Sequence, residues 1–154
     1  NVNELSIPLK GNEIENDKRV YYSDNSLLIA SLDEESKEDL RINNNFEIYN
    51  GALTESIVSE ALIKSGLKDL YFYKNENSTI ELDFIVRIKN EIIPIEVKTN
   101  RGRSKSMNKI ITDKKLKFGI KLSNQNIGYA DSKYTFPYFL TFLLIKFLKE
   151  KINW

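Results

Sequence analysis

Two strand-like runs, joined by only two residues, constrain the fold of this chain more than any other feature of its sequence. The runs are Ile80–Ile88 and Glu91–Lys98, and each has the alternating pattern of a strand. A connection of this length is typical of a tight β-hairpin, and we expect Asn90 to take the positive φ that asparagine tolerates better than most residues. The residues that flank the turn then face each other, and every pair on one face is apolar, as a core-facing surface requires. These pairs are Leu82–Val97, Phe84–Ile95 and Val86–Ile93.

The opposite face of the same hairpin places Asp83 directly across from Glu96. Directly opposed residues have Cβ atoms about 4.5–5.5 Å apart, a separation at which like charges destabilise a sheet. Two facing carboxylates are explained if a cation lies between them or if one of them holds a proton. Mg²⁺ and Mn²⁺ prefer oxygen ligands in octahedral geometry, so two carboxylates completed by water and a phosphate suit either ion.

Lys98 lies two residues after Glu96 and therefore projects on the same face of the strand. Its ammonium group would orient or activate a metal-bound water, or neutralise charge that develops on a phosphate. The alternative is a surface hairpin whose charges are solvated, with Glu81 and Lys98 forming an ordinary ion pair. The spacing Asp-x12-Glu-x-Lys occurs often by chance, so the sequence leaves both alternatives open.

The composition narrows the chemistry, because the 154 residues include no cysteine and no histidine. Disulfide frameworks, zinc fingers and cysteine nucleophiles are excluded, as are Ser-His-Asp triads and histidine general bases. If the chain is an enzyme, its chemistry depends on carboxylates, lysine, tyrosine or hydroxyl groups. Carboxylate chemistry with a hard metal ion is the natural candidate.

The formal net charge of +1 conceals an asymmetry along the chain, since residues 1–97 carry a net charge of −9 and residues 98–121 carry +8. A basic block of this density is typical of a surface that contacts phosphates, because lysine and arginine release condensed counterions from nucleic acid. The alternative is a solvated basic helix. For the nucleic-acid interface we expect contacts from Arg101, Arg103, Lys105 and Lys109.

The remaining elements predict an α/β fold in a single domain, with the order α-β-β-β-α-β followed by a C-terminal helix. We expect a mixed central sheet flanked by helices, and a loop or exposed turn for the charged segment Asp33–Asp39. The first helix is expected to bury Leu53, Ile57, Val58, Ala61 and Leu62. The expected helices are Gly51–Gly66, Ser104–Leu116 and Pro137–Lys151, and the strands outside the hairpin are Leu70–Tyr73 and Phe118–Leu122.

No targeting segment is visible, because Asn1–Lys10 lacks the basic start and apolar core of a signal peptide. The most apolar stretch, Tyr134–Leu148, is interrupted by Pro137 and is shorter than the roughly 20 residues that span a bilayer. We therefore expect a cytoplasmic protein without a membrane partner. The single methionine, Met107, is internal, so we also expect the sequence to be part of a longer polypeptide.

Five motifs in order resemble a domain of unknown function that follows the ATPase module of bacterial and archaeal AAA+ ATPases. The resemblance runs from about Val20 to Lys149 and implies an upstream ATPase domain, with ATP bound there and not by this segment. Residues 1–19 would then be a lead-in, and residues 20–154 the domain itself. The motifs are Gly51-Ala-Leu-Thr-Glu55, Glu81-Leu-Asp83-Phe, Ile93-Pro-Ile-Glu96-Val-Lys98, Ser104-Lys-Ser-Met107 and Thr135-Phe-Pro-Tyr138.

That family is similar to the PD-(D/E)xK, restriction-endonuclease-like superfamily, whose αβββαβ core has the order given above. The resemblance implies that Asp83 and Glu96 bind Mg²⁺ or Mn²⁺, that Lys98 is the catalytic lysine, and that Glu55 is the helix-borne acid of the site. On the helix, Glu55 falls at the flank of the buried stripe and could point into the sheet. The alternative is a solvated Glu55 without a partner, whereas Glu60 is expected to pair with Lys64 on the surface.

Three functions are compatible with these observations. The first is a metal-dependent nuclease domain that hydrolyses DNA. The second is a non-catalytic module that binds nucleic acid or a partner, or regulates the attached ATPase, since a fold does not determine a function. The third is a helix-mediated assembly domain, which would form a homo-oligomer through apolar residues that more often belong to a core. Those residues are Phe136, Tyr138, Phe139, Phe142, Leu143 and Phe147.

Overall fold

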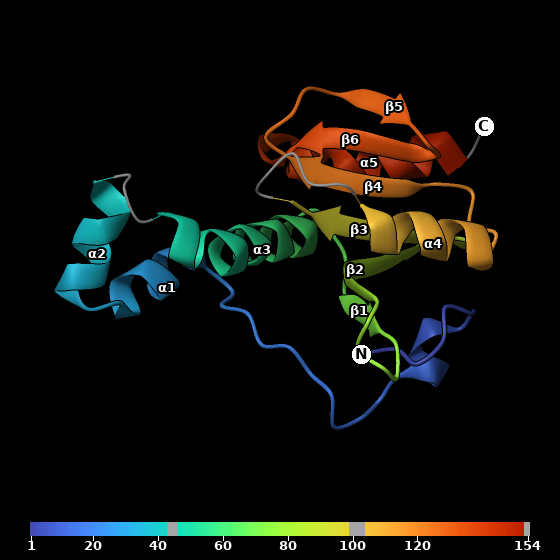
Figure 1. Cartoon of the computed structure of the whole chain (residues 1–154), viewed down its shortest axis with the longest axis horizontal. Coiled ribbons are helices and arrows are strands. Elements are labelled where there is room, and N and C mark those ends of the chain that lie inside the picture. The colour runs from blue at the N-terminus through green and yellow to red at the C-terminus, as the bar shows by residue number, and fades with distance from the viewer. Residues whose placement is uncertain (43–45, 99–103, 153–154) are drawn as a thin grey trace.

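The computed structural model describes residues 1–42, 46–98 and 104–152 (Figure 1). Within these ranges the chain forms five α-helices, two short 3-10 helices and six strands. The α-helices are α1 (Asn25–Ser31), α2 (Glu34–Arg41), α3 (Phe46–Lys64), α4 (Lys105–Asp113) and α5 (Thr141–Ile152), and the 3-10 helices are η1 (Leu9–Asn12) and η2 (Tyr138–Leu140). The strands are β1 (Tyr71–Lys74), β2 (Glu81–Ile88), β3 (Glu91–Val97), β4 (Gly119–Ser123), β5 (Gly128–Ala130) and β6 (Lys133–Pro137).

The strands form one mixed sheet in the order β1-β2-β3-β4-β6-β5. β1, β2 and β3 are antiparallel to one another, β4 is parallel to both β3 and β6, and β5 runs antiparallel to β6. The expected α/β class and the order α-β-β-β-α-β are confirmed by α3, β1, β2, β3, α4 and β4. β5 and β6 were not expected from the sequence. β5 is only three exposed residues long and carries no alternating apolar pattern.

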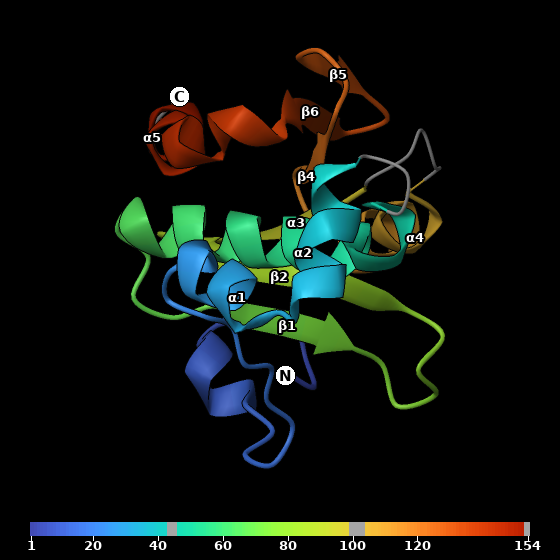
Figure 2. The ribbon, with the colours of Figure 1, turned by 90° about the vertical axis from the view of Figure 1, so that its left-hand side faces the viewer.

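Helices cover both faces of the sheet (Figure 2), with α3 and α5 on one face and α4 on the other. Two clusters of buried apolar side chains fill these layers, and burying each such side chain stabilises the fold by roughly 1.5–3 kcal/mol. The α3/α5 cluster includes Val58, Leu62, Phe84, Ile93, Ile95, Leu144 and Leu148. The α4 cluster includes Val2, Leu5, Leu9, Leu82, Ile85, Met107 and Ile110. Residues 1–19 therefore contribute three side chains to the core of the domain.

The β2–β3 hairpin has the register that the sequence predicts, with Phe84 opposite Ile95 and Val86 opposite Ile93. The expected position of the unusual backbone angle was wrong. The positive φ, 54°, belongs to Lys89 and not to Asn90. Either residue of a two-residue turn can carry a positive φ, so the turn length alone determines the register.

A β-bulge in β2 changes the direction of its first side chains. Tyr71 pairs with Ile85 and Tyr73 pairs with Leu82, so β2 contains one more residue than β1 in this interval. The bulge places Leu82 in the α4 cluster, whereas Phe84 lies in the α3/α5 cluster. The expectation that these two residues share a face was therefore wrong. An extra residue in a strand reverses the alternation of the side chains beyond it.

The charged segment Asp33–Asp39 is not a loop, because it forms most of α2. Asp33 caps this helix, and its carboxylate accepts a hydrogen bond from the Ser36 backbone N–H at 2.8 Å. Acidic residues in the first turn and Arg41 in the last turn also match the helix dipole. Local ion pairs add to this, and they are Glu34–Lys37 and Glu38–Arg41.

Helix α3 begins earlier than expected and ends before Gly66, whose φ of 102° is incompatible with a continuing helix. Val58 and Leu62 are fully buried, as predicted. Ile57 is 46% exposed, so its expected place in the buried stripe was wrong. The N-terminal end of α3 extends beyond the sheet toward α1 and α2 (Figure 1), so only part of the helix covers the core.

Apolar residues in and just before the C-terminal helix lie partly in the core and partly on the surface. Phe136, Tyr138 and Phe147 pack against the α3/α5 cluster. Phe139 and Phe142 are 72% and 60% exposed, so this part of the chain is not simply a core helix. Over the described residues, no helix is both long enough and apolar enough to cross a membrane.

Candidate functional site

The β2–β3 hairpin opens at the end that carries the predicted acidic residues. Strand pairing begins at Ile88–Glu91 and ends at Phe84–Ile95, one pair before Asp83 would face Glu96. The carboxylate of Asp83 instead accepts a hydrogen bond from the Val97 backbone N–H at 2.7 Å. This contact places the Asp83 side chain against the backbone between Glu96 and Lys98.

The environment of Asp83 favours its protonated form. Burial is the largest effect and raises the pKa of Asp83 from its usual 3.8 to about 6. The nearby carboxylate of Glu55 contributes to this increase, while the hydrogen bond from Val97 and the charges of Lys98 and Arg19 oppose it. Glu55, Lys98 and Arg19 therefore all affect how readily Asp83 ionises.

Glu96 is only 4% exposed and pairs with Lys98, whose Nζ lies 2.9 Å from the Glu96 Oε1. The other carboxylate oxygen, Oε2, is buried and has no hydrogen-bond partner among the described residues. The expected alternative, a Glu81–Lys98 ion pair, was wrong because Glu81 pairs with Arg19. An unpartnered oxygen on a buried carboxylate is costly, and a bound cation would satisfy it.

Two contacts to the backbone of Lys98 fix its position at the end of β3. Its N–H donates a hydrogen bond to the Leu122 carbonyl at 2.8 Å, which extends the pairing of β3 with β4. Its carbonyl accepts a hydrogen bond from the hydroxyl of Tyr138, the first residue of η2. Tyr138 is therefore a positioning residue for Lys98, whereas the sequence suggested for it only a family motif and an apolar surface.

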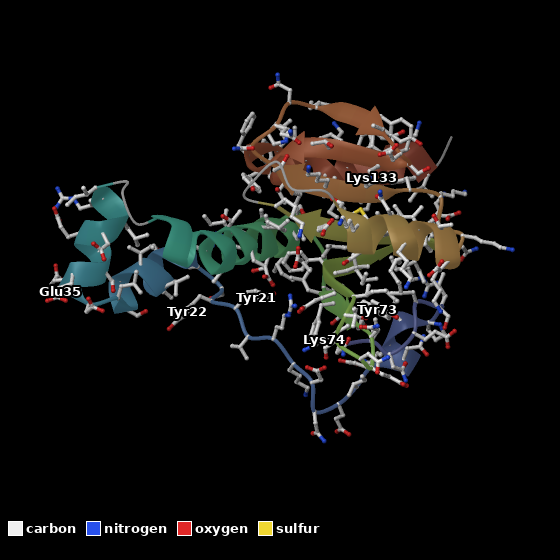
Figure 3. All side chains as sticks on the ribbon, in the orientation of Figure 1. Tyr21, Tyr22, Glu35, Tyr73, Lys74 and Lys133 are labelled. Atoms are coloured by element: carbon white, nitrogen blue, oxygen red, sulfur yellow. The ribbon has the colours of Figure 1, made fainter. Side chains whose placement is uncertain are left out.

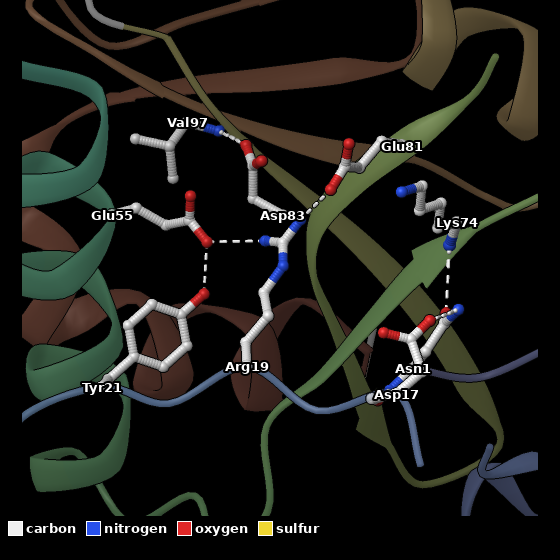
Figure 4. A network of polar contacts seen from close by, with 9 residues as sticks. All are labelled: Asn1, Asp17, Arg19, Tyr21, Glu55, Lys74, Glu81, Asp83 and Val97. Carbon is white, nitrogen blue, oxygen red and sulfur yellow. Dashed lines mark hydrogen bonds and ion pairs between the residues drawn. The ribbon is translucent and has the colours of Figure 1, made fainter. Parts of the chain in front are cut away.

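Glu55 projects from α3 toward the sheet, as one of the two expectations held (Figure 4). Its Oε1 lies 2.6 Å from Nη1 of Arg19 and also accepts a hydrogen bond from the hydroxyl of Tyr21. The alternative of a solvated, unpaired Glu55 was therefore wrong. Glu60 lies further along α3 and pairs with Lys64, as expected.

Arg19 and Tyr21 were not expected at the site from the sequence, although both contact its acidic residues. Arg19 bridges the Glu55 and Glu81 carboxylates, and burial together with Glu55 raises the pKa of Tyr21. No local pattern marks a contact between residues so far apart in the sequence. The one available signal is the composition, because Arg19 is a rare positive charge in a strongly acidic part of the chain.

The predicted metal ligands have suitable chemistry but are not arranged as a complete site. Among the described residues no group of three acidic side chains has a metal-binding arrangement. The Glu55 carboxylate raises the pKa of Asp83, and the charge of Lys98, which pairs with Glu96, lowers it. The unpartnered Glu96 oxygen fits a cation, whereas the guanidinium of Arg19 already neutralises Glu55.

The predicted nucleic-acid residues are only partly within the described chain. Lys105 and Lys109 are exposed on α4, and neither forms an ion pair with a described residue. Arg101 and Arg103 lie outside the described residues. The free ammonium groups on α4 are available to an anionic partner.

The fold and site together define a mixed α/β domain with a carboxylate–lysine cluster at the open end of its central hairpin. The chain belongs to the family described as a domain of unknown function (DUF4143), whose model matches residues 50–140. That match spans Glu55, Asp83, Glu96 and Lys98. No curated protein and no solved structure matches the chain.

Proposed function

We propose that this domain hydrolyses phosphodiester bonds of DNA in a reaction that depends on Mg²⁺ or Mn²⁺. The observation that carries the proposal is the junction of Asp83, Glu96 and Lys98 at one end of β3, with a buried and unpartnered oxygen on Glu96. The resemblance to the PD-(D/E)xK superfamily supports it, because that superfamily uses two acidic residues and a lysine in this order.

Each residue of the site has a role in this proposal. Asp83 and Glu96 would hold the metal ion, with Glu55 as the third acidic residue. When bound, the ion supplies Lewis-acid stabilisation of a phosphate and lowers the pKa of water. Lys98 neutralises charge on the reacting phosphate. Its ammonium group suits this role because it pairs with Glu96 and also affects the pKa of Asp83.

The proposal includes a surface that holds the DNA backbone next to this site. Lys105 and Lys109 lie on α4, which follows β3 in the chain. We include Arg101 and Arg103 in the same surface on the basis of the sequence. The upstream partner in this proposal is an AAA+ ATPase domain of the same polypeptide, which binds the ATP, in a cytoplasmic protein.

A second candidate is a non-catalytic module that binds nucleic acid or a partner, or regulates the ATPase. The observation that favours it is the ion pair of Arg19 with Glu55 and Glu81, which neutralises two acidic residues without a metal. In that case the carboxylates would have a structural role, and the basic residues of α4 would carry the binding.

Nicking of supercoiled plasmid and cleavage of single-stranded oligonucleotides test the first proposal, each with Mg²⁺, with Mn²⁺ and with a chelator. Lys98→Ala should reduce cleavage about 10²–10⁴-fold, the usual effect of removing a catalytic charge, while DNA binding by fluorescence anisotropy stays nearly unchanged. The matched control is Lys117→Ala, which removes the lysine of an exposed ion pair with Glu91 and should retain full activity.

Absence of metal-dependent cleavage on every DNA form, by the wild type and by Arg19→Gln, would contradict the nuclease proposal. Equal loss of cleavage in the Lys98 and Lys117 variants would contradict the assigned role of Lys98. The second candidate makes a different prediction for binding. Lys105→Ala and Lys109→Ala would each weaken DNA binding. Each would also reduce by about one the slope of the logarithm of the binding constant against the logarithm of the salt concentration.

A further inference from the structure

A strap of residues 18–22 crosses the site on its way from the N-terminal segment to α1 (Figures 1 and 4). Among the described residues, the strap forms no backbone–backbone hydrogen bond with another segment. Its side chains alternate in environment, since Val20 is 93% exposed and Tyr22 is 46% exposed while Arg19 and Tyr21 turn inward. Figure 3 shows both tyrosines beneath α3 on the trace that leads to α1.

Polar contacts of Arg19 and Tyr21 hold the strap against the domain. Both side chains bond to the same oxygen of Glu55, and Arg19 also pairs with Glu81. The guanidinium carbon lies 4.3 Å from the ring centroid of Phe72, which adds a cation–π contact. The strap is thus attached mainly through Glu81 and through Glu55, which is one of the predicted metal ligands.

Two surface pockets border the strap. One pocket, of about 220 Å³, is lined by Arg19, Tyr21, Asp83 and Phe84 among others. The second, of about 410 Å³, is lined by the same two strap residues together with Ala52 and Glu55. A segment without backbone hydrogen bonds to the rest of the domain, and with open space beside it, can detach at small cost to the rest of the fold.

We propose that Arg19 is an internal counter-ion that takes the place of a divalent cation, and that the strap must withdraw before Glu55 joins Asp83 in binding metal. The guanidinium forks between two carboxylates, which is a favourable geometry for arginine. A metal ion and Arg19 would compete for the same Glu55 oxygen. This inference rests on the proposed metal-dependent function. In it, the strap closes the site when Arg19 pairs with Glu55 and opens it when it withdraws.

Calorimetric titration with Mn²⁺ alone tests the competition. Arg19→Gln should bind Mn²⁺ about tenfold more tightly than the wild type, which corresponds to the loss of ~1.4 kcal/mol of competition. The control is Lys18→Gln, which removes an equal charge from an exposed neighbour in the strap and should change the affinity by less than about twofold. Equal affinities for the wild type and Arg19→Gln would overturn the inference, and so would absence of binding by Arg19→Gln.

A second variant keeps the test decisive if Arg19→Gln does not fold. Tyr21→Phe removes one attachment of the strap without changing any charge, and should increase Mn²⁺ affinity about threefold, as expected for one lost hydrogen bond. No change in this variant would contradict the proposed attachment.

A spin label reports the movement of the strap itself. The chain has no cysteine, so Val20→Cys gives one labelling site on an exposed residue of the strap. Saturating Mg²⁺, which is diamagnetic, should increase the mobility of the nitroxide, and an unchanged spectrum would overturn the inference. If Arg19→Gln binds Mn²⁺ more tightly but no variant cleaves DNA, the strap inference stands and the nuclease proposal fails.

Discussion

The two ends of the β2–β3 hairpin differ in how their charged side chains are paired and buried. At the turn, pairing is complete as far as Ile88–Glu91, and Glu91 pairs with Lys117, a lysine that is 65% exposed. At the open end the pairing stops, Glu96 is almost completely buried, and Asp83 has a raised pKa. The regular end contributes stability, whereas the irregular end contains charged groups that weaken the fold. Such local cost is expected where a site binds a ligand.

The bulge in β2 explains how one hairpin supports both ends. It inserts an extra residue between Leu82 and Ile85, next to Asp83. The strand can then keep Leu82 in the α4 cluster while Asp83 turns to the Val97 backbone near Glu55. Bulges often redirect a side chain at a functional position.

The largest expected effect comes from removing the charge of Asp83. Because the folded-state pKa is raised from 3.8 to about 6, ionisation of Asp83 opposes folding. Its cost is absent below pH 4, grows as the pH rises through the window from 4 to 6, and is complete above pH 6. Asp83→Asn should therefore be more stable than the wild type at pH 8 by up to about 3 kcal/mol, and equally stable at pH 4.

Urea denaturation of both proteins from pH 4 to pH 8 measures this difference. Glu91→Gln is the control from the turn end and should differ little from the wild type over the whole range. A difference between wild type and Asp83→Asn that does not change with pH would contradict the raised pKa of Asp83.

A smaller effect distinguishes the two lysine–glutamate pairs of the hairpin. Lys98→Met leaves the buried Glu96 without its ion-pair partner and should cost about 1–3 kcal/mol. Lys117→Met disrupts an exposed pair and should cost about 1 kcal/mol or less. Denaturant midpoints at pH 7.5 and low salt compare the two variants. Equal costs would show that burial does not separate the two ends.

The sequence determines the hairpin register well, because its turn length and apolar pairs depend only on neighbouring residues. Phe84–Ile95 and Val86–Ile93 pair as predicted for this reason. The bulge beside Leu82 was not predictable from the hairpin alone, because it arises from pairing with β1. Likewise α2 was taken for a loop, although its cap Asp33 is visible in the sequence.

The roles expected for the residues of the candidate site stay predictions, and only some of the contacts between these residues could be expected from the sequence. Glu96 and Lys98 are two residues apart on one strand, so their contact follows from strand geometry. The contact of Glu55 with Arg19 joins residues 36 positions apart, and no periodicity indicates it. Long-range polar contacts of this kind depend on the tertiary fold, so the sequence does not indicate the pair of Arg19 with Glu55. The metal ion expected between Asp83 and Glu96 stays a prediction.

The melting temperature in the presence of Mn²⁺ tests the central claim that the open end of the hairpin is a metal site. At about 100 times the dissociation constant, Mn²⁺ should raise the melting temperature of the wild type and of Glu91→Gln by roughly 5–10 °C. Asp83→Asn should start from a higher melting temperature without metal and lose most of this response. A response of the same size in Asp83→Asn, or no response in any of the three proteins, would contradict the metal site.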